Sequence, residues 1–220
     1  MFELVWERLL EDYGPQGWWP AEGRFEIIVG AVLVQRTAWR NAARAIENLR
    51  RAEALSPQEI AKLETSRLRA LIRPAGFYRA KSERLKALAD FVVAAGGLDQ
   101  LDRLDTQALR ERLIAQQGIG PETADAILGY AFARPVFVVD AYARRLFGRF
   151  LGEEVSDQTL KRRCESALES VDRLNELHAL IVVHSQRRCS TDPACATCGL
   201  IDVCARAQRQ ATAQPARAIG

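Results

Sequence analysis

The sequence predicts an all-α protein, and three observations support this fold class. Apolar residues recur with the helical period of about 3.6 along nearly the whole chain. Helix signals separate these segments, including the capping box Ser56-Pro57-Gln58-Glu59, in which proline takes the first helical position. No convincing pair of strands joined by a hairpin turn is present, and the sequence has no internal repeat.

The expected helices follow one another closely along the chain. Residues 1–14 have an acidic, amphipathic helical pattern, and 24–34 are almost unbroken apolar, which suits a buried helix. The capping box starts a further helix at Pro57. The remaining expected helices span 81–95, 106–117, 121–133, 141–151, 156–170 and 173–185. The small, polar segment 207–220 is expected to be a loose tail.

Length and composition narrow the class of protein. The 220 residues suffice for one domain or two modest lobes. No apolar run reaches the roughly 18 residues of a membrane helix, and the acidic N-terminal segment is unlike a signal peptide, so we expect a cytoplasmic protein. The net charge of +3 comes mainly from arginine, whose planar fork suits phosphate. A GC-rich genome would give the same bias, so the charge only weakly supports a nucleic-acid partner.

The stretch 118-GIGPETADAIL-128 has the form of a hairpin that opens a helix. Glycines allow a tight turn and close backbone approach, and the N–H groups at the start of the second helix can hold an anion. An ordinary turn between helices is the alternative. Asp140 follows twenty residues after Gly120, directly behind the apolar run from Val136 to Val139. It is either a helix N-cap or a functional acid.

The two segments GIGPETADAIL and VFVVDAYARRL together resemble the helix-hairpin-helix DNA glycosylases of the endonuclease III type. The resemblance implies two helical lobes with a DNA cleft between them. One is a barrel over 24–134 that contains the hairpin, and the other joins 1–23 to 135–206. It also implies that Asp140 is catalytic, that Gly118 and Gly120 bind DNA, and that a monomer acts on double-stranded DNA containing a damaged base.

Glu122 departs from the pattern of many members of this family. The position often holds a lysine that attacks the sugar, forms a Schiff base and then cuts the strand. A glutamate cannot form an imine, so we expect hydrolytic base removal with weak or absent lyase activity. The residue also has a purely structural explanation, since an acid in the first turn of a helix contributes about 0.3–1 kcal/mol.

Four cysteines lie close together in 189-CSTDPACATCGLIDVC-204, namely Cys189, Cys195, Cys198 and Cys204. Disulfides are rare in the cytoplasm, and four soft ligands indicate zinc or an iron–sulfur cluster. The family resemblance implies a 4Fe-4S cluster that shapes a loop. The family usually has six residues between the first two cysteines, whereas this chain has five.

Three tryptophans precede or follow the expected buried helix. Trp18, Trp19 and Trp39 are similar to the positions that sandwich the extruded base in the 3-methyladenine glycosylase branch, although ordinary core packing explains such residues too. An alkylated purine is cationic, and indole rings attract cations. By the same resemblance, Gln35 and Phe77 hold the duplex open after a base is flipped out.

Three functions are therefore considered. The first is a monofunctional glycosylase that removes an alkylated base. The second is an endonuclease III-like glycosylase for oxidised pyrimidines with lyase activity. The third is a non-catalytic binder of damaged DNA, which would have no need of Asp140. The tryptophans favour the first over the second, and in each case we expect a cytoplasmic protein associated with the nucleoid.

Overall fold

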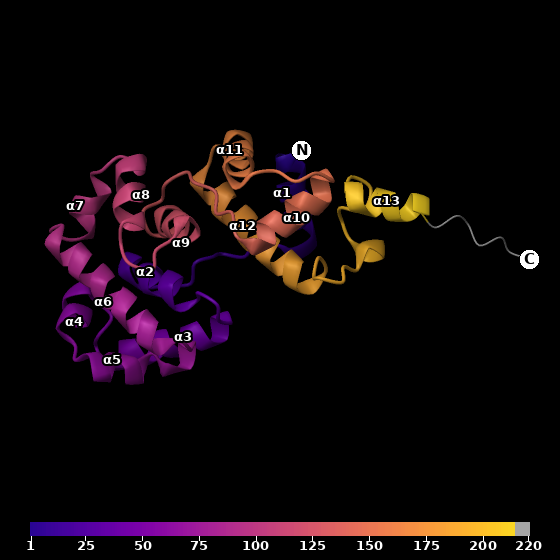
Figure 1. The fold of residues 1–220 in the computed structure, drawn as a ribbon. Helices are drawn as coiled ribbons and strands as arrows, with labels where there is room; N and C mark the ends of the chain where they lie inside the picture. Colours follow the sequence, from indigo (N-terminus) through magenta and orange to yellow (C-terminus); the bar gives the residue numbers. More distant parts are fainter. Residues whose placement is uncertain (214–220) are drawn as a thin grey trace, which may run out of the picture. The chain divides into compact units, whose positions relative to one another are not determined.

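The structure is a computed structural model that describes residues 1–213. These residues form α-helices joined by short turns, and none of them belongs to a β-strand, which confirms the all-α fold class (Figure 1). No helix in this part of the chain is long and apolar enough to cross a membrane. The chain divides into two compact units. The middle unit is Trp19–Arg134, and the terminal unit joins Met1–Trp18 to the chain from Pro135.

The middle unit is built around one buried helix. Eight of the ten residues of α2 are buried, as expected, and α2 contacts α3, α6, α9 and η2. Its apolar character on all sides suits that central place. The helices of this unit are α2 (Arg24–Leu33), α3 (Trp39–Arg51), α4 (Pro57–Lys62), α5 (Thr65–Leu71), η1 (Arg73–Ala75), α6 (Tyr78–Ala94), α7 (Leu98–Asp102), α8 (Thr106–Ile114), α9 (Pro121–Ala126) and η2 (Ile127–Ala131).

The terminal unit packs the two ends of the chain together. In Figure 1 the indigo helix α1 lies among the orange helices α10, α11 and α12, and α1 contacts both α11 and α12. Their shared core includes Val5, Leu9, Phe147 and Leu177, all nearly inaccessible to solvent. The helices of this unit are α1 (Phe2–Tyr13), α10 (Ala141–Leu151), α11 (Asp157–Leu168), α12 (Val171–Arg187), η3 (Cys195–Thr197) and α13 (Ala205–Ala213).

Helix ends follow the sequence signals in some places and not in others. Ser56 caps α4 as expected, because its Oγ accepts a hydrogen bond from the Glu59 N–H at 3.2 Å. The helix expected over 121–133 changes instead into a π-helical turn, η2, at Ile127. Residues 207–213 belong to α13 and are not a loose tail, since Ala207 is buried and α13 contacts α10. The rest of the expected tail, 214–220, lies outside the described residues.

The first boundary between the units lies after Trp18, whereas the sequence predicted it after residue 23. Residues 19–23 belong to the middle unit because the Trp19 ring packs there. The indole meets Trp39 and Tyr130 with ring centroids 5.3 Å apart in both cases. It also lies against Gly30 of α2, where an added Cβ would stand 3.0 Å from Trp19 Nε1. A larger residue at position 30 would push this ring out of place.

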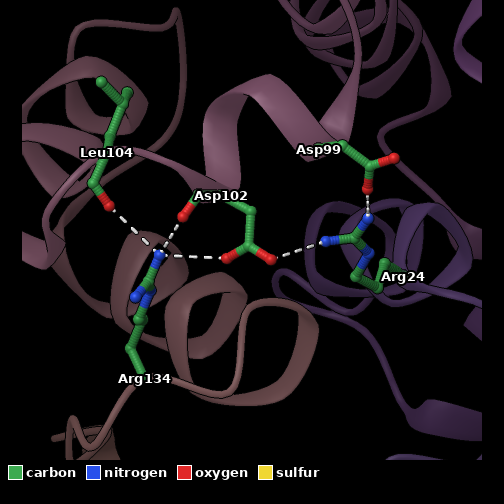
Figure 2. Close-up of polar contacts among 5 residues, drawn as sticks. All are labelled: Arg24, Asp99, Asp102, Leu104 and Arg134. Atoms are coloured by element: carbon green, nitrogen blue, oxygen red, sulfur yellow. Dashed lines mark hydrogen bonds and ion pairs between the residues drawn. The ribbon is translucent and has the colours of Figure 1, made fainter.

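A polar network holds α7 to both ends of the middle unit (Figure 2). Arg24, the first residue of α2, donates hydrogen bonds to Asp99 and Asp102 of α7. Arg134, just beyond η2, donates to the Asp102 carboxylate at 3.0 Å and to the Leu104 carbonyl at 3.1 Å. The Asp102 side chain thus accepts from two arginines that are far apart in the sequence. The network fixes the start of the α8–turn–α9 hairpin.

Candidate functional site

The hairpin between α8 and α9 needs glycine at only one of its two glycine positions. Gly118 has a φ of 77°, in the left-handed region, and an added Cβ would stand 2.5 Å from Cδ of Arg84. Gly120 has an extended backbone with a φ of −88°, and nothing lies within 4 Å of where its Cβ would be. The turn therefore uses the conformational freedom of glycine at Gly118 and not at Gly120.

Gln35 lies in the turn after α2 and is bound to this hairpin. Its Nε2 donates to the Gly118 carbonyl at 3.2 Å and to Thr123 Oγ1 at 3.0 Å. Its Oε1 accepts a hydrogen bond from Arg84 of α6. These bonds bring the turn after α2 and the hairpin together within the middle unit.

Phe77 precedes α6 and is exposed, with 64% of its surface accessible. Its φ of 46° places it in the left-handed region, which costs a bulky residue energy. Packing within the protein does not account for a side chain that is this exposed. A strained, exposed aromatic residue is instead a candidate for contact with a ligand.

Glu122 is the second residue of α9 and is exposed. A carboxylate in the first turn complements the positive end of the helix dipole. The side chain at the lyase-lysine position is thus an accessible carboxylate that the helix dipole of α9 stabilises.

Asp140 caps helix α10 and is largely buried, with 14% of its side chain accessible. Its Oδ1 accepts from the Ala143 N–H at 2.7 Å, and its Oδ2 lies 3.6 Å from His178 Nε2. Burial alone would raise the pKa of Asp140. The hydrogen bond and charge of His178 and the N–H groups of Ala143 and Tyr142 together outweigh burial, so the pKa is lowered from 3.8. The carboxylate is therefore held ionised.

His178 was missed by the sequence reasoning. It lies on α12, is 7% exposed, and meets the edge of the Trp18 ring at a centroid distance of 6.2 Å. The available signal was a polar residue on the apolar face of an expected helix, in a chain that contains only two histidines. The contact with Asp140 depends on how α10 packs against α12, which residue spacing does not give.

The Trp19 and Trp39 rings do not form a preformed parallel sandwich. Trp18 belongs to the terminal unit, whereas Trp19 and Trp39 belong to the middle unit. The Trp19 and Trp39 rings are perpendicular, with 87° between their planes. Edge-to-face contact is a favourable arrangement for neighbouring aromatic rings, and it leaves no parallel gap for a third ring. Each of the three side chains is partly exposed.

The four clustered cysteines line one hollow of the terminal unit, together with Arg149 and His184. None of the five cysteines forms a disulfide. Burial raises the pKa of the Cys198 thiol. The Leu200 N–H opposes this rise, and the charges of Cys189, Cys204 and Cys195 add to it, which reflects their proximity. Arg149 Nη1 lies 3.3 Å from Cys189 Sγ.

This donor set fits a metal centre in its chemistry, since four soft ligands face one hollow beside a cation. Among the side chains that the structure describes, residues 1–209, no three His, Cys, Asp or Glu are grouped closely enough to hold a metal ion. Cys164 stands apart, fully buried in the core of the terminal unit. Cys164 lies outside the cysteine-rich segment in the sequence, and it is also separate from the four clustered cysteines in the fold.

Comparison with known proteins places the chain in a family. Residues 29–170 match the model of the HhH-GPD superfamily of base excision DNA repair proteins. The chain belongs to this family. It is a DNA glycosylase of base excision repair, and DNA is its substrate.

Relatives cover nearly the whole length of this glycosylase. A protein of Methanocaldococcus jannaschii named as a DNA repair glycosylase is 40% identical over 93% of this chain and 96% of its own. Endonuclease III of Sulfolobus acidocaldarius is 30% identical over 82% of this chain and 81% of its own.

Solved structures share the fold. That of the 3-methyladenine DNA glycosylase MagIII of H. pylori, bound to 1,N6-ethenoadenine, has a TM-score of 0.72 at 32% identity. It covers 84% of this chain and 97% of its own. An endonuclease III trapped as a covalent intermediate with DNA has a TM-score of 0.77 over 95% and 96% of the two chains. Its 18% identity is evidence for the fold alone.

The glycines of the hairpin provide a matched pair of substitutions. Gly118→Ala should lower the free energy of unfolding by about 1–2 kcal/mol, because alanine is strained in the left-handed region and its Cβ meets Arg84. Gly120→Ala should cost little, since its backbone suits alanine and the space is open. Urea unfolding measures both. Equal losses would contradict the assigned turn geometry.

The lowered pKa of Asp140 gives a pH dependence with a definite sign. The folded pKa lies below the unfolded value of about 3.8, so the ionised carboxylate stabilises the fold fully above that pH. This stabilisation is lost as the pH falls through the folded pKa. Urea unfolding measures the free energy of unfolding at each pH. Between about pH 6 and pH 3 this free energy should fall more steeply for wild type than for Asp140→Asn, whose amide does not titrate. If the free energy of unfolding falls with pH in the same way for both proteins, folding does not lower the pKa of Asp140.

Proposed function

We propose that this protein is a monofunctional glycosylase that hydrolyses the bond between an alkylated base and its deoxyribose in double-stranded DNA. The observation that carries the proposal is the ionised, largely buried Asp140 beside His178. Breaking the glycosidic bond develops positive charge on the sugar, and a nearby carboxylate stabilises that charge. A non-catalytic binder, the third hypothesis, would need Asp140 only as the N-cap of α10, and it gives no reason for the contact with His178.

Asp140 acts on the sugar and on water in this proposal. As the base leaves with the bonding electrons, the carboxylate faces the developing positive charge at C1′ and accepts a proton from the attacking water. The hydroxide adds to C1′, and a cationic alkylated base leaves as a neutral molecule that needs no added proton. Asp140 then releases the proton taken from water to the solvent. His178 keeps the carboxylate oriented and charged through its contact with Oδ2. The products are a free base and an intact strand with an abasic site.

Glu122 supports the absence of a strand-cutting step. Cleavage by elimination needs an amine that forms an imine with the opened sugar. The exposed side chain at the hairpin position is a carboxylate, which cannot supply this bond. Hydrolysis by Asp140 therefore ends the reaction.

The tryptophans support an alkylated purine as the substrate base. The H. pylori relative with 32% identity is a 3-methyladenine glycosylase bound to a modified adenine. Trp19 and Trp39 present indole rings that attract a cationic base. Because these rings are perpendicular, a base stacks on one face, or one ring turns to make room for it. Trp18, in the terminal unit, contacts His178, whose Nε2 lies 3.6 Å from Asp140 Oδ2.

In this proposal the hairpin and the two turns that contain Gln35 and Phe77 contact the DNA. The backbone at Gly118 and Gly120 approaches a phosphate, while Phe77 inserts into the base stack and Gln35 fills the space left by the flipped base. The exposure and left-handed backbone of Phe77 support this role. Gln35 has to exchange its bonds to Gly118 and Thr123 for bonds to DNA.

The four cysteines that share one hollow hold a 4Fe-4S cluster in this proposal. Such a cluster can transfer electrons, but base hydrolysis is not a redox reaction and needs none from it. We assign it a structural role, in which it fixes the loop from Cys189 to Cys204 against α10. Arg149 stabilises the charge of this centre by its contact with Cys189.

A second function is supported by the relative from Sulfolobus acidocaldarius, which is an endonuclease III. An enzyme of that type acting on oxidised pyrimidines would need a nucleophilic amine from elsewhere in the chain. The two functions differ in the base released and in the state of the strand afterwards.

Asp140→Asn should keep DNA binding and lower the rate of base release by about 100-fold or more, because the amide carries no charge and accepts no proton. The measurement is single-turnover release of an alkylated purine from a duplex. Asp105→Asn is the matched control, since Asp105 caps α8 in the same way with a 2.9 Å bond to the Ala108 N–H. Full activity of Asp140→Asn would exclude Asp140 from the reaction.

Borohydride trapping tests the role of Glu122. It reduces an imine to a permanent enzyme–DNA crosslink, so wild type should give no covalent band on a denaturing gel. Glu122→Lys should give one, because the hairpin then presents an amine. Glu59→Lys, in the first turn of another short helix that begins with proline, should give none. A strong band with wild type would establish a different nucleophile and end the monofunctional interpretation.

The metal centre is tested by its colour and composition. Purified protein should be brown and contain about four irons per chain, because thiolate-to-iron charge transfer absorbs broadly in the visible range. Cys198→Ser should lose iron and lower the thermal unfolding temperature, while Cys164→Ala should keep its iron. A colourless protein with stoichiometric zinc would refute the cluster.

A further inference from the structure

Lys81 is a buried cation for which the proposed reaction has no use. It lies at the end of the first turn of α6 and is 1% exposed. Its Nζ donates to two backbone carbonyls, those of Leu33 and Ala75, each at 2.8 Å. A buried charge is costly unless polar groups satisfy it, and here the two carbonyls do so. The Lys81 ammonium group therefore links two segments of the fold.

The two carbonyls belong to the ends of two helical elements. Leu33 is the last residue of α2, and Ala75 is the last residue of η1. Carbonyls at helix C-termini lack partners within the helix and carry partial negative charge, so both attract an ammonium group. Burial and the neighbouring charge of Arg84 lower the pKa of Lys81 to about 8. The side chain joins two ends that the backbone does not connect directly.

Each of these carbonyls stands two residues before a proposed insertion residue. Gln35 follows Leu33, and Phe77 follows Ala75. Both turns also contain a left-handed residue other than glycine, Arg36 with a φ of 54° and Phe77 with a φ of 46°. Such backbone persists only where surrounding contacts hold it. One ammonium group therefore fixes the base of both strained turns.

A second side chain of α6 extends this arrangement. Arg84, three residues beyond Lys81, donates to Gln35 Oε1 and packs where Gly118 leaves space. One face of α6 thus contacts the turn with Gln35 and the hairpin, while the helix itself begins next to Phe77.

We propose that Lys81 is a positioning residue that holds the Gln35 and Phe77 turns in the geometry needed to open the duplex. This inference rests on the proposed glycosylase function. Lys81 does not touch the reacting atoms. It acts on the step in which the base leaves the stack, which is most difficult for a paired base and easiest for a mismatched one.

The test compares Lys81→Met with wild type on one lesion in two duplexes, one with the lesion paired and one with it mismatched. We expect a loss of about tenfold in single-turnover release from the paired duplex and less than about twofold from the mismatched one. Lys86→Met is the matched control. Lys86 lies on the same helix and donates to the Ala61 carbonyl at 2.9 Å, away from both turns. It should leave the ratio between the duplexes unchanged.

A second measurement does not depend on bond cleavage. With 2-aminopurine placed beside the lesion, binding by wild type should raise the fluorescence as bases unstack, and Lys81→Met should bind without this rise. If wild type unstacks DNA but releases no base, the proposed function fails and the role of Lys81 stands.

Two results would overturn the role of Lys81. One is an equal loss on paired and mismatched duplexes, and the other is a normal fluorescence rise with Lys81→Met. Phe77→Ala adds a further check, since Lys81→Met should cause little extra loss in that background. If Lys81→Met does not fold, Lys81→Gln keeps a donor for one carbonyl and takes its place in the same assays.

Discussion

The contact between Asp140 and His178 is the interaction on which the proposed chemistry depends. It joins the first residue before α10 to the buried face of α12, so the packing of these two helices sets the distance between carboxylate and imidazole. The same carboxylate caps α10 and, in the proposal, stabilises a positive sugar. Its lowered pKa keeps it ionised, which the reaction needs and which also favours the cap.

The middle unit carries a different part of the proposed function. In the proposal its residues recognise and open DNA. They are held by side chains that reach across turns: Arg84 to Gln35, and Lys81 to the ends of α2 and η1. The buried cation Lys81 binds helix ends in the middle unit, as the buried anion Asp140 does in the terminal unit. Both charges are satisfied by backbone groups at helix ends, which lets short, irregular turns keep one conformation.

The sequence predicted features that depend on local spacing. Helix periodicity gave the all-α class, and the capping box at Ser56 forms as expected. The four cysteines line one hollow because they lie within sixteen residues of one another. Features that depend on packing between distant segments were beyond it. His178 meets Asp140 from another helix, Trp19 meets Trp39 edge-on, and 207–213 form a helix because α10 offers a surface for it.

The most direct test of the central claim is a panel of duplexes, each with a single defined lesion, scored for free base and for strand breaks before and after hot alkali. We expect release of alkylated purines, with breaks appearing only after alkali has cleaved the abasic site. Release of oxidised pyrimidines with strand breaks before alkali would contradict it, and would assign the protein to the lyase-active type.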